Sequence, residues 1–413
     1  MSHKATCRPL LSLATLLIPF ALFIPSAKMK WCNSKVPLQG NLLGIAAFAV
    51  LQGGLAHAVS LPPPTGEYHV GVSKHTIEHY NPHDVLAPDN ISTAFIATIY
   101  YPTLQKPGSD PQPYLEPELA AILEAEWNYT SGFLSTVTST LQYDAPFLEG
   151  PAGESGFPTL LFGPGGGGPP VSGNTILISE LVSHGYTVVG LDHPFEQPFL
   201  RYPNGTGVEG VKIDYTDAEL LQGIYNTRLA DTKAFLDYFP KLVEKLGAPF
   251  STTHIGSFGY SLGGAAAVGS LYGDDRLVSG LNLDGGLYGP RANLNDSSAD
   301  TKKPVLFLGN EVHTGEDAIH DITWGTFPPW QTAYFGKFTI NGTTHHDFCD
   351  DTFWKTIEPT DPTTGPIDGN RQVAITNAYV KAFLDFALLG QGSPILDGPS
   401  AEWPEVVFYD GSA

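Results

Sequence analysis

Short apolar runs separated by helical or mixed stretches dominate the chain from residue 157 onward. Runs of this length, bounded by turn residues, are typical of parallel strands that are buried on both faces. They are "PTLLFG", "YTVVGLD", "THIGSFG", "SGLNLD", "KPVLFLG" and "FGKFTI". Helical patterns such as "TILISELVSHG" and "LGGAAAVGSLYG" lie between most of them. Strands that alternate with helices predict an α/β fold with a mostly parallel central sheet flanked by helices.

The part of the chain before residue 157 has a different pattern. Two β-rich segments, residues 68–72 and 93–101, are separated by a polar loop, and we expect them to pair antiparallel at one edge of the sheet. Residues 104–153 mix proline and glycine with one helical patch, "EPELAAILEAEW", which is the composition of an insertion that acts as a lid. At the other end, residues 373–389 predict a closing helix. Residues 59–413 are therefore predicted to form a single domain with an insertion at about residues 104–153.

The first 58 residues have the pattern of a targeting segment. Two apolar runs, residues 10–24 and 42–51, are each shorter than a membrane span. Lysines precede the second run and an A-x-A cleavage site follows it, which is the order of a signal peptide. We therefore expect residues 29–58 to be a signal peptide and residues 1–28 to be an upstream extension. On the alternative reading, the first run is an uncleaved anchor that holds the protein at a membrane.

The composition narrows the class of protein and its partners. Hydrophobic residues make up 42% of the 413 residues, which is enough for a sizeable core. The formal net charge of −21 at pH 7 leaves no basic face for nucleic acid or for an anionic membrane surface. After residue 58 the only cysteine is Cys349, so no internal disulfide can close and the core must hold the domain.

Sequons for N-glycosylation follow the predicted signal peptide. Five asparagines begin an N-x-[ST] triplet without proline: Asn90, Asn128, Asn204, Asn295 and Asn341. Their number, behind a signal-like segment, predicts a secreted glycoprotein. No membrane span is expected once the signal peptide is removed.

One serine stands in a G-x-S-x-G motif, Gly259-Tyr260-Ser261-Leu262-Gly263, between a strand pattern and a helical run of small residues. In this setting the motif presents its serine as a nucleophile on a sharp, strained turn. The flanking glycines are needed because larger side chains would collide with neighbouring strands. The helix that follows also offers the Leu262 N–H and its dipole to a developing oxyanion. Ser261 is therefore the predicted nucleophile, and Leu262 is a predicted oxyanion-hole donor.

A serine hydroxyl needs a base within hydrogen-bond reach, and that base must be oriented by an acid. Behind a nucleophile turn of this kind, the order along the chain is serine, acid, histidine. His345 follows the run "FGKFTI" and a turn that contains Gly342, so we predict that it is the base. Two carboxylates remain open as the acid: Asp284 ends the run "SGLNLD", and Glu311 follows the next run.

A glycine-rich stretch, "LLFGPGGGGPP", brings backbone N–H groups to the end of an earlier predicted strand. We predict that Gly166 in this stretch is the second oxyanion-hole donor. A phosphate loop is excluded because no Lys-Ser/Thr pair follows, and a dinucleotide loop is excluded by the two prolines. The alternative is a tight turn without a function.

A metal site is the alternative for the histidine loop. Its candidate ligands would be His345, His346, Asp347 and Asp350. We do not favour it, because the ligands would be near neighbours in one loop without a second clear pair. No metal or organic cofactor is expected, since a serine mechanism supplies its own nucleophile and electrostatics.

These motifs resemble those of the platelet-activating-factor acetylhydrolase family of α/β-hydrolases, the plasma and fungal type, over most of residues 66–392. "GYSLGGA" is similar to the nucleophile turn of the family, "LNLDGG" to its acid strand, "HHDFCD" to its histidine loop and "AYVKAFLDFALLG" to its closing helix. The resemblance selects Asp284 over Glu311, because the acid of the family follows the strand after the nucleophile. It implies the α/β-hydrolase fold and five site residues: Ser261 as nucleophile, Asp284 as acid, His345 as base, and the N–H groups of Gly166 and Leu262 as oxyanion hole.

The resemblance also implies an activity. We expect a secreted serine ester hydrolase that acts through an acyl-enzyme on short or truncated acyl esters, possible substrates being lipids of the 1-alkyl-2-acetylglycerophosphocholine type. The chain departs from the family at Pro164-Gly165, where His-Gly is usual, and at Asp192-His193-Pro194, where an acidic-His-Arg stretch is usual. Both places border the acyl site. A cutinase, a polyester hydrolase or a general carboxylesterase would share these motifs, and a non-catalytic binding module could keep the same fold.

Overall fold

The computed structural model describes residues 59–148, 156–290, 294, 296–314, 321–358 and 363–409. The predicted signal peptide and the upstream extension lie outside the described residues, as do Asn295 and the end of the predicted insertion. Among the described residues, no helix combines the length and the apolar character needed to cross a membrane.

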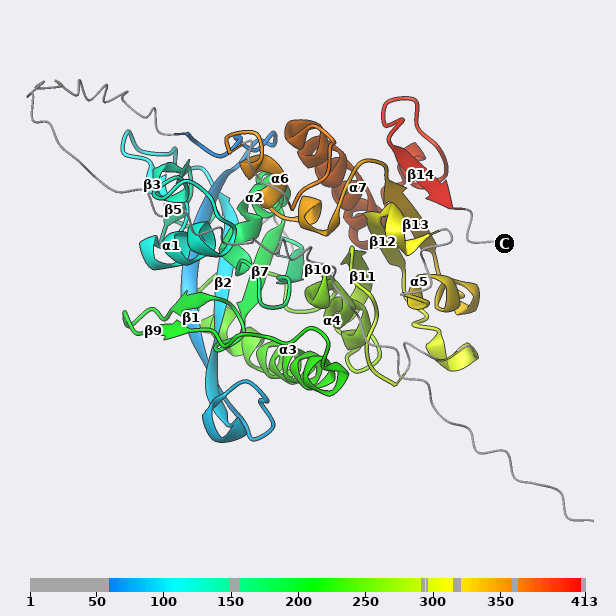
Figure 1. The fold of residues 1–413 in the computed structure, drawn as a ribbon, viewed down its shortest axis with the longest axis horizontal. Helices are drawn as coiled ribbons and strands as arrows, with labels where there is room; N and C mark the ends of the chain where they lie inside the picture. Colours follow the sequence, from blue (N-terminus) through cyan, green and yellow to red (C-terminus); the bar gives the residue numbers. More distant parts are fainter. Residues whose placement is uncertain are drawn as a thin grey trace, which may run out of the picture.

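A ten-stranded sheet runs through the molecule, in the order β14-β13-β12-β11-β10-β6-β7-β2-β1-β5 (Figure 1). Six neighbouring strands pair parallel from β13 to β7, as the buried apolar runs predict. The strands of the sheet are β1 (His69–Asn81), β2 (Ser92–Thr103), β5 (Gln142–Tyr143), β6 (Thr159–Gly163), β7 (Thr187–Asp192), β10 (Ile255–Tyr260), β11 (Leu277–Leu283), β12 (Val305–Asn310), β13 (Phe335–Ile340) and β14 (Val406–Tyr409).

Helices cover both faces of the sheet, and the two longest helices, α3 and α7, have capping residues at both ends. The helices are α1 (Pro117–Glu126), α2 (Thr175–Ser183), α3 (Ala218–Leu246), α4 (Leu262–Ser270), α5 (Thr323–Thr326), α6 (Asp351–Trp354) and α7 (Gly369–Leu389). Helix α3 begins after Asp217, whose side chain accepts hydrogen bonds from the first turn, and ends at Gly247 in the left-handed conformation. Helix α7 ends in the same way at Gly390, where the sequence predicts its end.

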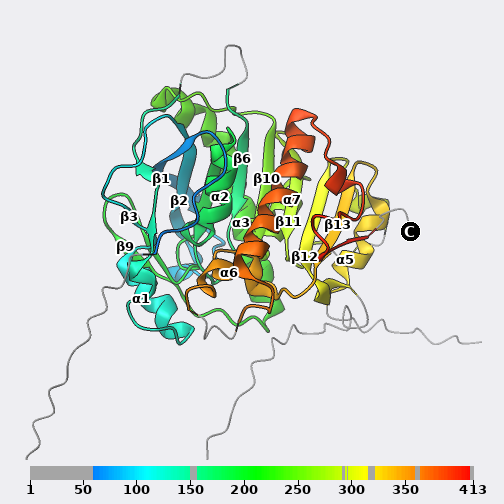
Figure 2. The same cartoon turned by 90° about the horizontal axis from the view of Figure 1, so that it is seen from above.

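Two apolar clusters fill the space between the sheet and the helices. Helices α2 and α7 lie on one face of the sheet, and helices α3 and α4 lie on the other face (Figures 1 and 2). Their apolar side chains belong to one cluster on each face. Both faces of the parallel strands are thus buried, which is why these strands lack a polar face in the sequence. The predicted α/β-hydrolase architecture is confirmed, with its mostly parallel sheet and flanking helices.

The N-terminal edge differs in detail from the prediction. Strands β1 and β2 pair antiparallel, as expected, but β1 runs on to Asn81, well beyond the predicted residue 72. Its second half alternates buried and exposed positions and carries polar side chains, so the apolar pattern stops before the strand does. Strand β14, which pairs antiparallel with β13, was not predicted.

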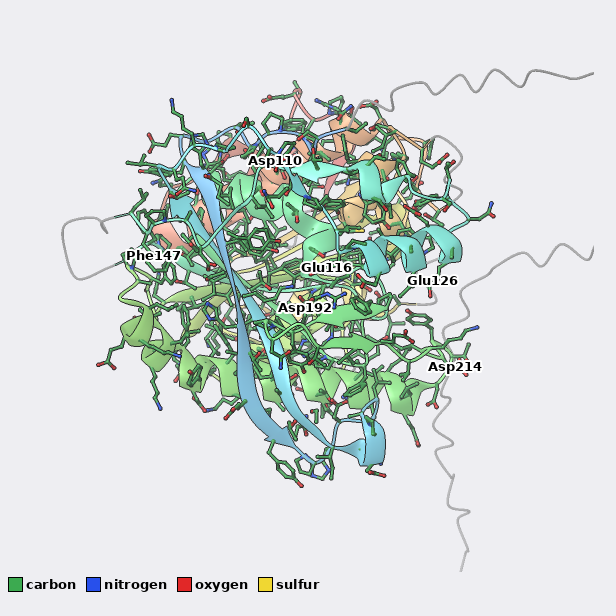
Figure 3. All side chains as sticks on the ribbon, turned by 90° about the vertical axis from the view of Figure 1, so that its left-hand side faces the viewer. Asp110, Glu116, Glu126, Phe147, Asp192 and Asp214 are labelled. Atoms are coloured by element: carbon green, nitrogen blue, oxygen red, sulfur yellow. The ribbon has the colours of Figure 1, made fainter. Side chains whose placement is uncertain are left out.

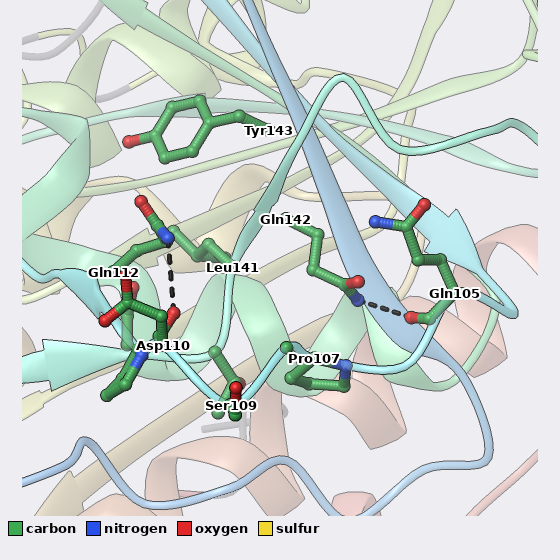
Figure 4. A pocket seen from close by; sticks show the side chains of 12 residues that line it. Gln105, Pro107, Ser109, Asp110, Gln112, Leu141, Gln142 and Tyr143 are labelled. Atoms are coloured by element: carbon green, nitrogen blue, oxygen red, sulfur yellow. Dashed lines mark hydrogen bonds between the residues drawn. The ribbon is translucent and has the colours of Figure 1, made fainter.

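The described part of the insertion, residues 104–148, packs beside this edge. It contains α1, a small sheet of β3 (Gln112–Pro113) and β4 (Thr138–Ser139), and β5, which joins the main sheet next to β1. In Figure 3, α1 runs between Glu116 and Glu126. A hollow of about 480 Å³ in the insertion is lined mostly by polar residues of the segments 105–112 and 139–143, and by none of the five predicted site residues (Figure 4).

Candidate active site

The turn between β10 and α4 carries Ser261 in a strained backbone conformation, with φ 55° and ψ −123°. Non-glycine residues rarely adopt such a φ, and holding one there costs about 1–3 kcal/mol. The flanking glycines make the turn possible. A Cβ on Gly263 would lie 2.0 Å from the carbonyl oxygen of Gly163, and a Cβ on Gly259 would lie 2.4 Å from the carbonyl carbon of Gly263. The steric reason predicted for the glycines is therefore present in the structure.

Three of the predicted site residues form one hydrogen-bonded line. His345 Nε2 lies 2.9 Å from Ser261 Oγ, and His345 Nδ1 lies 2.6 Å from Asp284 Oδ2. Ser261 follows β10, Asp284 follows β11, and His345 begins η8 (His345–Phe348) after β13. The Asp284 side chain is fully buried, whereas 39% of the His345 side chain is exposed. The imidazole thus connects a buried carboxylate to a hydroxyl at the surface of the site.

The carboxylate of Asp284 is held by several donors. The backbone N–H and the side-chain amide of Asn310 donate to it at 2.5 and 2.8 Å, and His313 Nε2 lies 3.3 Å from its Oδ1. Burial alone would raise the pKa of Asp284, but His313 and His345 outweigh it and hold that pKa below its ordinary value. The carboxyl group is therefore ionised, as an acid that orients a histidine must be.

Glu311, the alternative candidate for the acid, is not part of this hydrogen-bonded series. It is an exposed residue in the first turn of η5 (Glu311–His313), directly after β12. The structure therefore brings Asp284, and not Glu311, to His345.

The residues after His345 are bound elsewhere and do not converge on a common point. His346 Nδ1 lies 3.0 Å from Asp351 Oδ2, Asp347 accepts hydrogen bonds from Thr344 and Lys355, and Asp350 accepts one from Tyr114. Within the described part of the chain, no group of three or more histidine, cysteine or acidic residues is arranged to hold a metal ion.

The glycine loop after β6 lies beside the nucleophile turn. A Cβ on Gly165 would lie 3.7 Å from the Ser261 Cβ, and a Cβ on Gly166 would lie 3.2 Å from the Leu262 side chain. Arg228 donates to the carbonyl oxygens of Pro164 and Gly165 at 2.5 and 3.1 Å. Because N–H and C=O point in opposite directions across a trans peptide, the N–H groups of Gly165 and Gly166 point away from Arg228.

The guanidinium of Arg228 is itself buried and paired. It donates to both carboxylate oxygens of Glu196, and both side chains are 2% exposed. On the outer side of the loop, the Tyr215 hydroxyl donates to the Gly166 carbonyl oxygen at 2.9 Å. Long side chains from α3 and from the segment before it therefore fix the carbonyl groups of the glycine loop.

Arg228 was not predicted as a site residue, although the helical spacing of α3 contains a signal for it. The buried residues of the first part of α3 form one stripe with helical spacing, namely Leu221, Ile224, Tyr225, Thr227, Arg228, Asp231 and Phe235. An arginine on the buried stripe of a helix needs an acidic partner in the interior. His313 and Asn310, which hold Asp284, left no comparable signal in the sequence.

The insertion meets the histidine loop from outside. The Trp127 ring packs edge-on against the His346 ring at 5.7 Å, and the Tyr114 hydroxyl donates to Asp350 at 2.7 Å. An apolar cluster that includes Leu119, Leu123 and Trp354 joins α1 to α6. The insertion is thus attached beside the candidate site, and its action as a lid stays a prediction.

Comparisons with known proteins found a family model, a named protein and a solved structure that are similar to this chain. A family model described as "Platelet-activating factor acetylhydrolase, isoform II" matches residues 233–389, a segment that contains Ser261, Asp284 and His345 but not Gly166. A protein of Arthroderma benhamiae named "Probable 1-alkyl-2-acetylglycerophosphocholine esterase" is 29% identical over 273 residues, 62% of this chain and 67% of that protein. The solved structure of a ferulic acid esterase from Streptomyces cinnamoneus matches 86% of this chain and 100% of its own, with a TM-score of 0.69 and 24% identity. At that identity the structural likeness shows the fold.

Proposed function

Because the chain belongs to the platelet-activating factor acetylhydrolase family and is a carboxylic ester hydrolase, we propose that Ser261, His345 and Asp284 cleave short or truncated acyl esters. The hydrogen-bonded line from Ser261 Oγ through the His345 ring to Asp284 Oδ2 carries the proposal. A serine, a histidine and a buried carboxylate in this order are the groups that acyl transfer needs.

The proposed reaction has two halves. Ser261 Oγ attacks the ester carbonyl while His345 Nε2 takes the hydroxyl proton, and the imidazolium passes that proton to the leaving alcohol. Water then attacks the acyl-enzyme, with His345 again acting as base, and releases the acid and the free serine. Asp284 stabilises the imidazolium in both halves. The N–H groups of Gly166 and Leu262 are the proposed donors to the oxyanion of each tetrahedral intermediate.

The substrate class is proposed from the relative and from the surroundings of the glycine loop. The name of the Arthroderma benhamiae protein supports an acetyl ester on a glycerophosphocholine. Leu262 and Ile213 belong to one apolar cluster beside the loop, and a Cβ on Gly167 would lie 3.0 Å from the Ile213 side chain. We propose that this cluster borders the place of a short acyl group.

Export and glycosylation are part of the proposal. The four sequon asparagines that the structure describes, Asn90, Asn128, Asn204 and Asn341, are all exposed, which supports glycosylation. Sequencing the N-terminus of protein from the culture medium should give a start near Val59. Intact residues 1–58 in a membrane fraction would favour the anchor instead.

A substrate panel tests the activity. It comprises short-chain and long-chain acyl esters, acetylated and oxidised phospholipids, and an insoluble polyester, with Ser261→Ala as the control. We expect turnover of short acyl esters and of acetylated phospholipid, and none by Ser261→Ala. Action on the polyester alone would favour the polyester-hydrolase alternative. Failure of the wild-type protein to exceed Ser261→Ala on every ester would favour a binding module.

A further inference from the structure

Asp284 has a second histidine on the side away from His345. His345 Nδ1 lies 2.6 Å from Oδ2 of the carboxylate, and His313 Nε2 lies 3.3 Å from its Oδ1. The other ring nitrogen of His313, Nδ1, lies 2.9 Å from Asp321 Oδ2. The His313 ring therefore bridges two carboxylates, one of which belongs to the candidate active site.

Contacts with two carboxylates favour the protonated form of His313. A neutral imidazole has one N–H donor and one bare nitrogen, so it can donate to only one of the two carboxylates. Only an imidazolium can donate to both. The His313 side chain is 8% exposed, and it stacks on the Trp324 ring with centroids 4.1 Å apart and an angle of 11° between the planes. An aromatic face of this kind also stabilises a cation.

The groups around the bridge favour the same state. Asp321 Oδ1 accepts hydrogen bonds from the Thr323 N–H and hydroxyl, which keeps its carboxylate in place. Trp324 Nε1 donates to the carbonyl oxygen of Gly285, the residue after Asp284. Burial would lower the pKa of His313, but Asp284 and Asp321 overcome it and raise that pKa to about 9.

We propose that His313 is a charged positioning residue for Asp284, and that its imidazolium sets the acidic end of the pH range in which His345 works as a base. The inference rests on the proposed function of Ser261, His345 and Asp284. When His345 takes up a proton, two imidazolium rings share the single negative charge of Asp284. In a variant that lacks the charge of His313, only one imidazolium would share the charge of Asp284, so we expect the pH dependence of the reaction to change in that variant.

Other aromatic, charged and titratable groups near His345 and His313 do not supply a second positive charge to Asp284. Tyr260 packs on the His345 ring with centroids 5.0 Å apart, and the His346 ring lies 6.2 Å away and faces Asp351. Lys337 interacts electrostatically with Asp321, on the far side of His313. His313 is thus the cation in contact with the carboxylate that His345 uses.

The pH dependence of kcat/KM tests the proposal in His313→Gln. Glutamine can still donate a hydrogen bond to Asp284 but carries no charge. We expect the acidic limb of the profile to move up by about one pH unit, the effect of one charge at this range in a partly screened site. The control is His184→Gln, which removes a histidine paired with Glu180 on α2 and should leave the limb in place. A lower plateau with an unmoved limb would mean that His313 only supports the structure, and would overturn the proposal.

A second measurement needs neither a substrate nor a folded variant. In wild-type protein with ¹⁵N-labelled histidine, His313 can be recognised by its proximity to the Trp324 ring protons. We expect both ring nitrogens of His313 to carry hydrogen at pH 7. A bare nitrogen at pH 7 would overturn the inference even if the enzyme hydrolyses esters. A protonated ring in a protein that hydrolyses no ester would instead remove the proposed function.

Discussion

The two sides of Ser261 are built by different means. On the acid side, neighbouring strands position the groups through their backbones: the Ser261 N–H donates to Leu283 at 2.7 Å, and the Asp284 N–H donates to Leu308 at 3.0 Å. On the oxyanion side, a glycine loop is held by the side chains of Arg228 and Tyr215, which lie far along the chain. Strand ends therefore position the proposed triad, whereas the buried side chain of Arg228 and the exposed side chain of Tyr215 position the loop.

The difference matters for how each side responds to substitution. Backbone hydrogen bonds between strands survive a change of side chain, so the acid side should lose chemistry without losing its shape. The oxyanion side depends on an ion pair that is 2% exposed in both partners. Removing one partner of such a pair leaves an uncompensated buried charge, which costs about 3–5 kcal/mol.

The largest expected effect is on the acid side. Asp284→Asn should keep the fold but lower kcat by up to about 10⁴-fold, because the amide favours the wrong tautomer of His345. Glu311→Gln is the matched control, and we expect it to lose less than about tenfold, the scale of a screened field from an exposed charge. Steady-state kinetics with circular dichroism as the check of folding would measure both. The reverse order in two folded variants would assign the acid to Glu311.

The next effect is on the oxyanion side. Arg228→Lys keeps a charge beside Glu196 but loses the fork that binds both the carboxylate and the loop carbonyls. We expect kcat to fall by about 10²-fold, the scale of a displaced oxyanion-hole donor. Arg371→Lys, at the surface pair with Glu405, should leave kcat unchanged. Equal kcat values in the two variants would mean that the buried pair of Arg228 and Glu196 does not position the glycine loop.

A smaller effect, on stability, distinguishes two glycines in the same region. In Gly263→Ala, the new Cβ would meet the Gly163 carbonyl oxygen at 2.0 Å, so we expect the free energy of unfolding to fall by about 3 kcal/mol. Gly168 has open space around its Cβ position, and Gly168→Ala should change it by less than about 0.5 kcal/mol. Urea denaturation measures both. Equal losses would contradict the close approach of the nucleophile turn to β6.

The last effect concerns the attachment of the insertion to the histidine loop. Burial raises the pKa of Asp350, which accepts a hydrogen bond from Tyr114, to about 7. Since this pKa lies above the unfolded value of 3.8, the folded state holds the extra proton between about pH 4 and 7, and stability falls as pH rises through that window. Asp350→Asn should reduce the decrease of the free energy of unfolding between about pH 4 and 7. Urea denaturation at several pH values measures it. An unchanged slope would mean that Asp350 ionises normally.

The same contrast between the two sides explains what the sequence could predict. The parallel strands, the nucleophile turn and His345 follow from local patterns, because apolar runs and glycine spacing act over a few residues. The choice of Asp284 over Glu311 needed the family resemblance, since both residues follow strands.

The missed features all depend on residues that are distant in the chain. Arg228 and Glu196 meet only after α3 packs on the glycine loop, and His313 becomes a bridge only when Asp284 and Asp321 lie on either side of it. Strand β14 is short and only partly buried, so it has no strong apolar pattern. Such features come from packing. The buried stripe of α3 indicates that Arg228 is buried, but no local pattern specifies its partner or the partners of His313.

Labelling with a fluorophosphonate probe tests the central claim most directly, because such a probe reacts with a serine activated by a base and an acid. Mass spectrometry of the folded wild-type protein should find one adduct, on the peptide that contains Ser261. His345→Gln should label slower by about 10³-fold or more, since the base is lost while the serine remains. A folded wild-type protein without an adduct on Ser261, or with equal labelling in His345→Gln, would contradict the account.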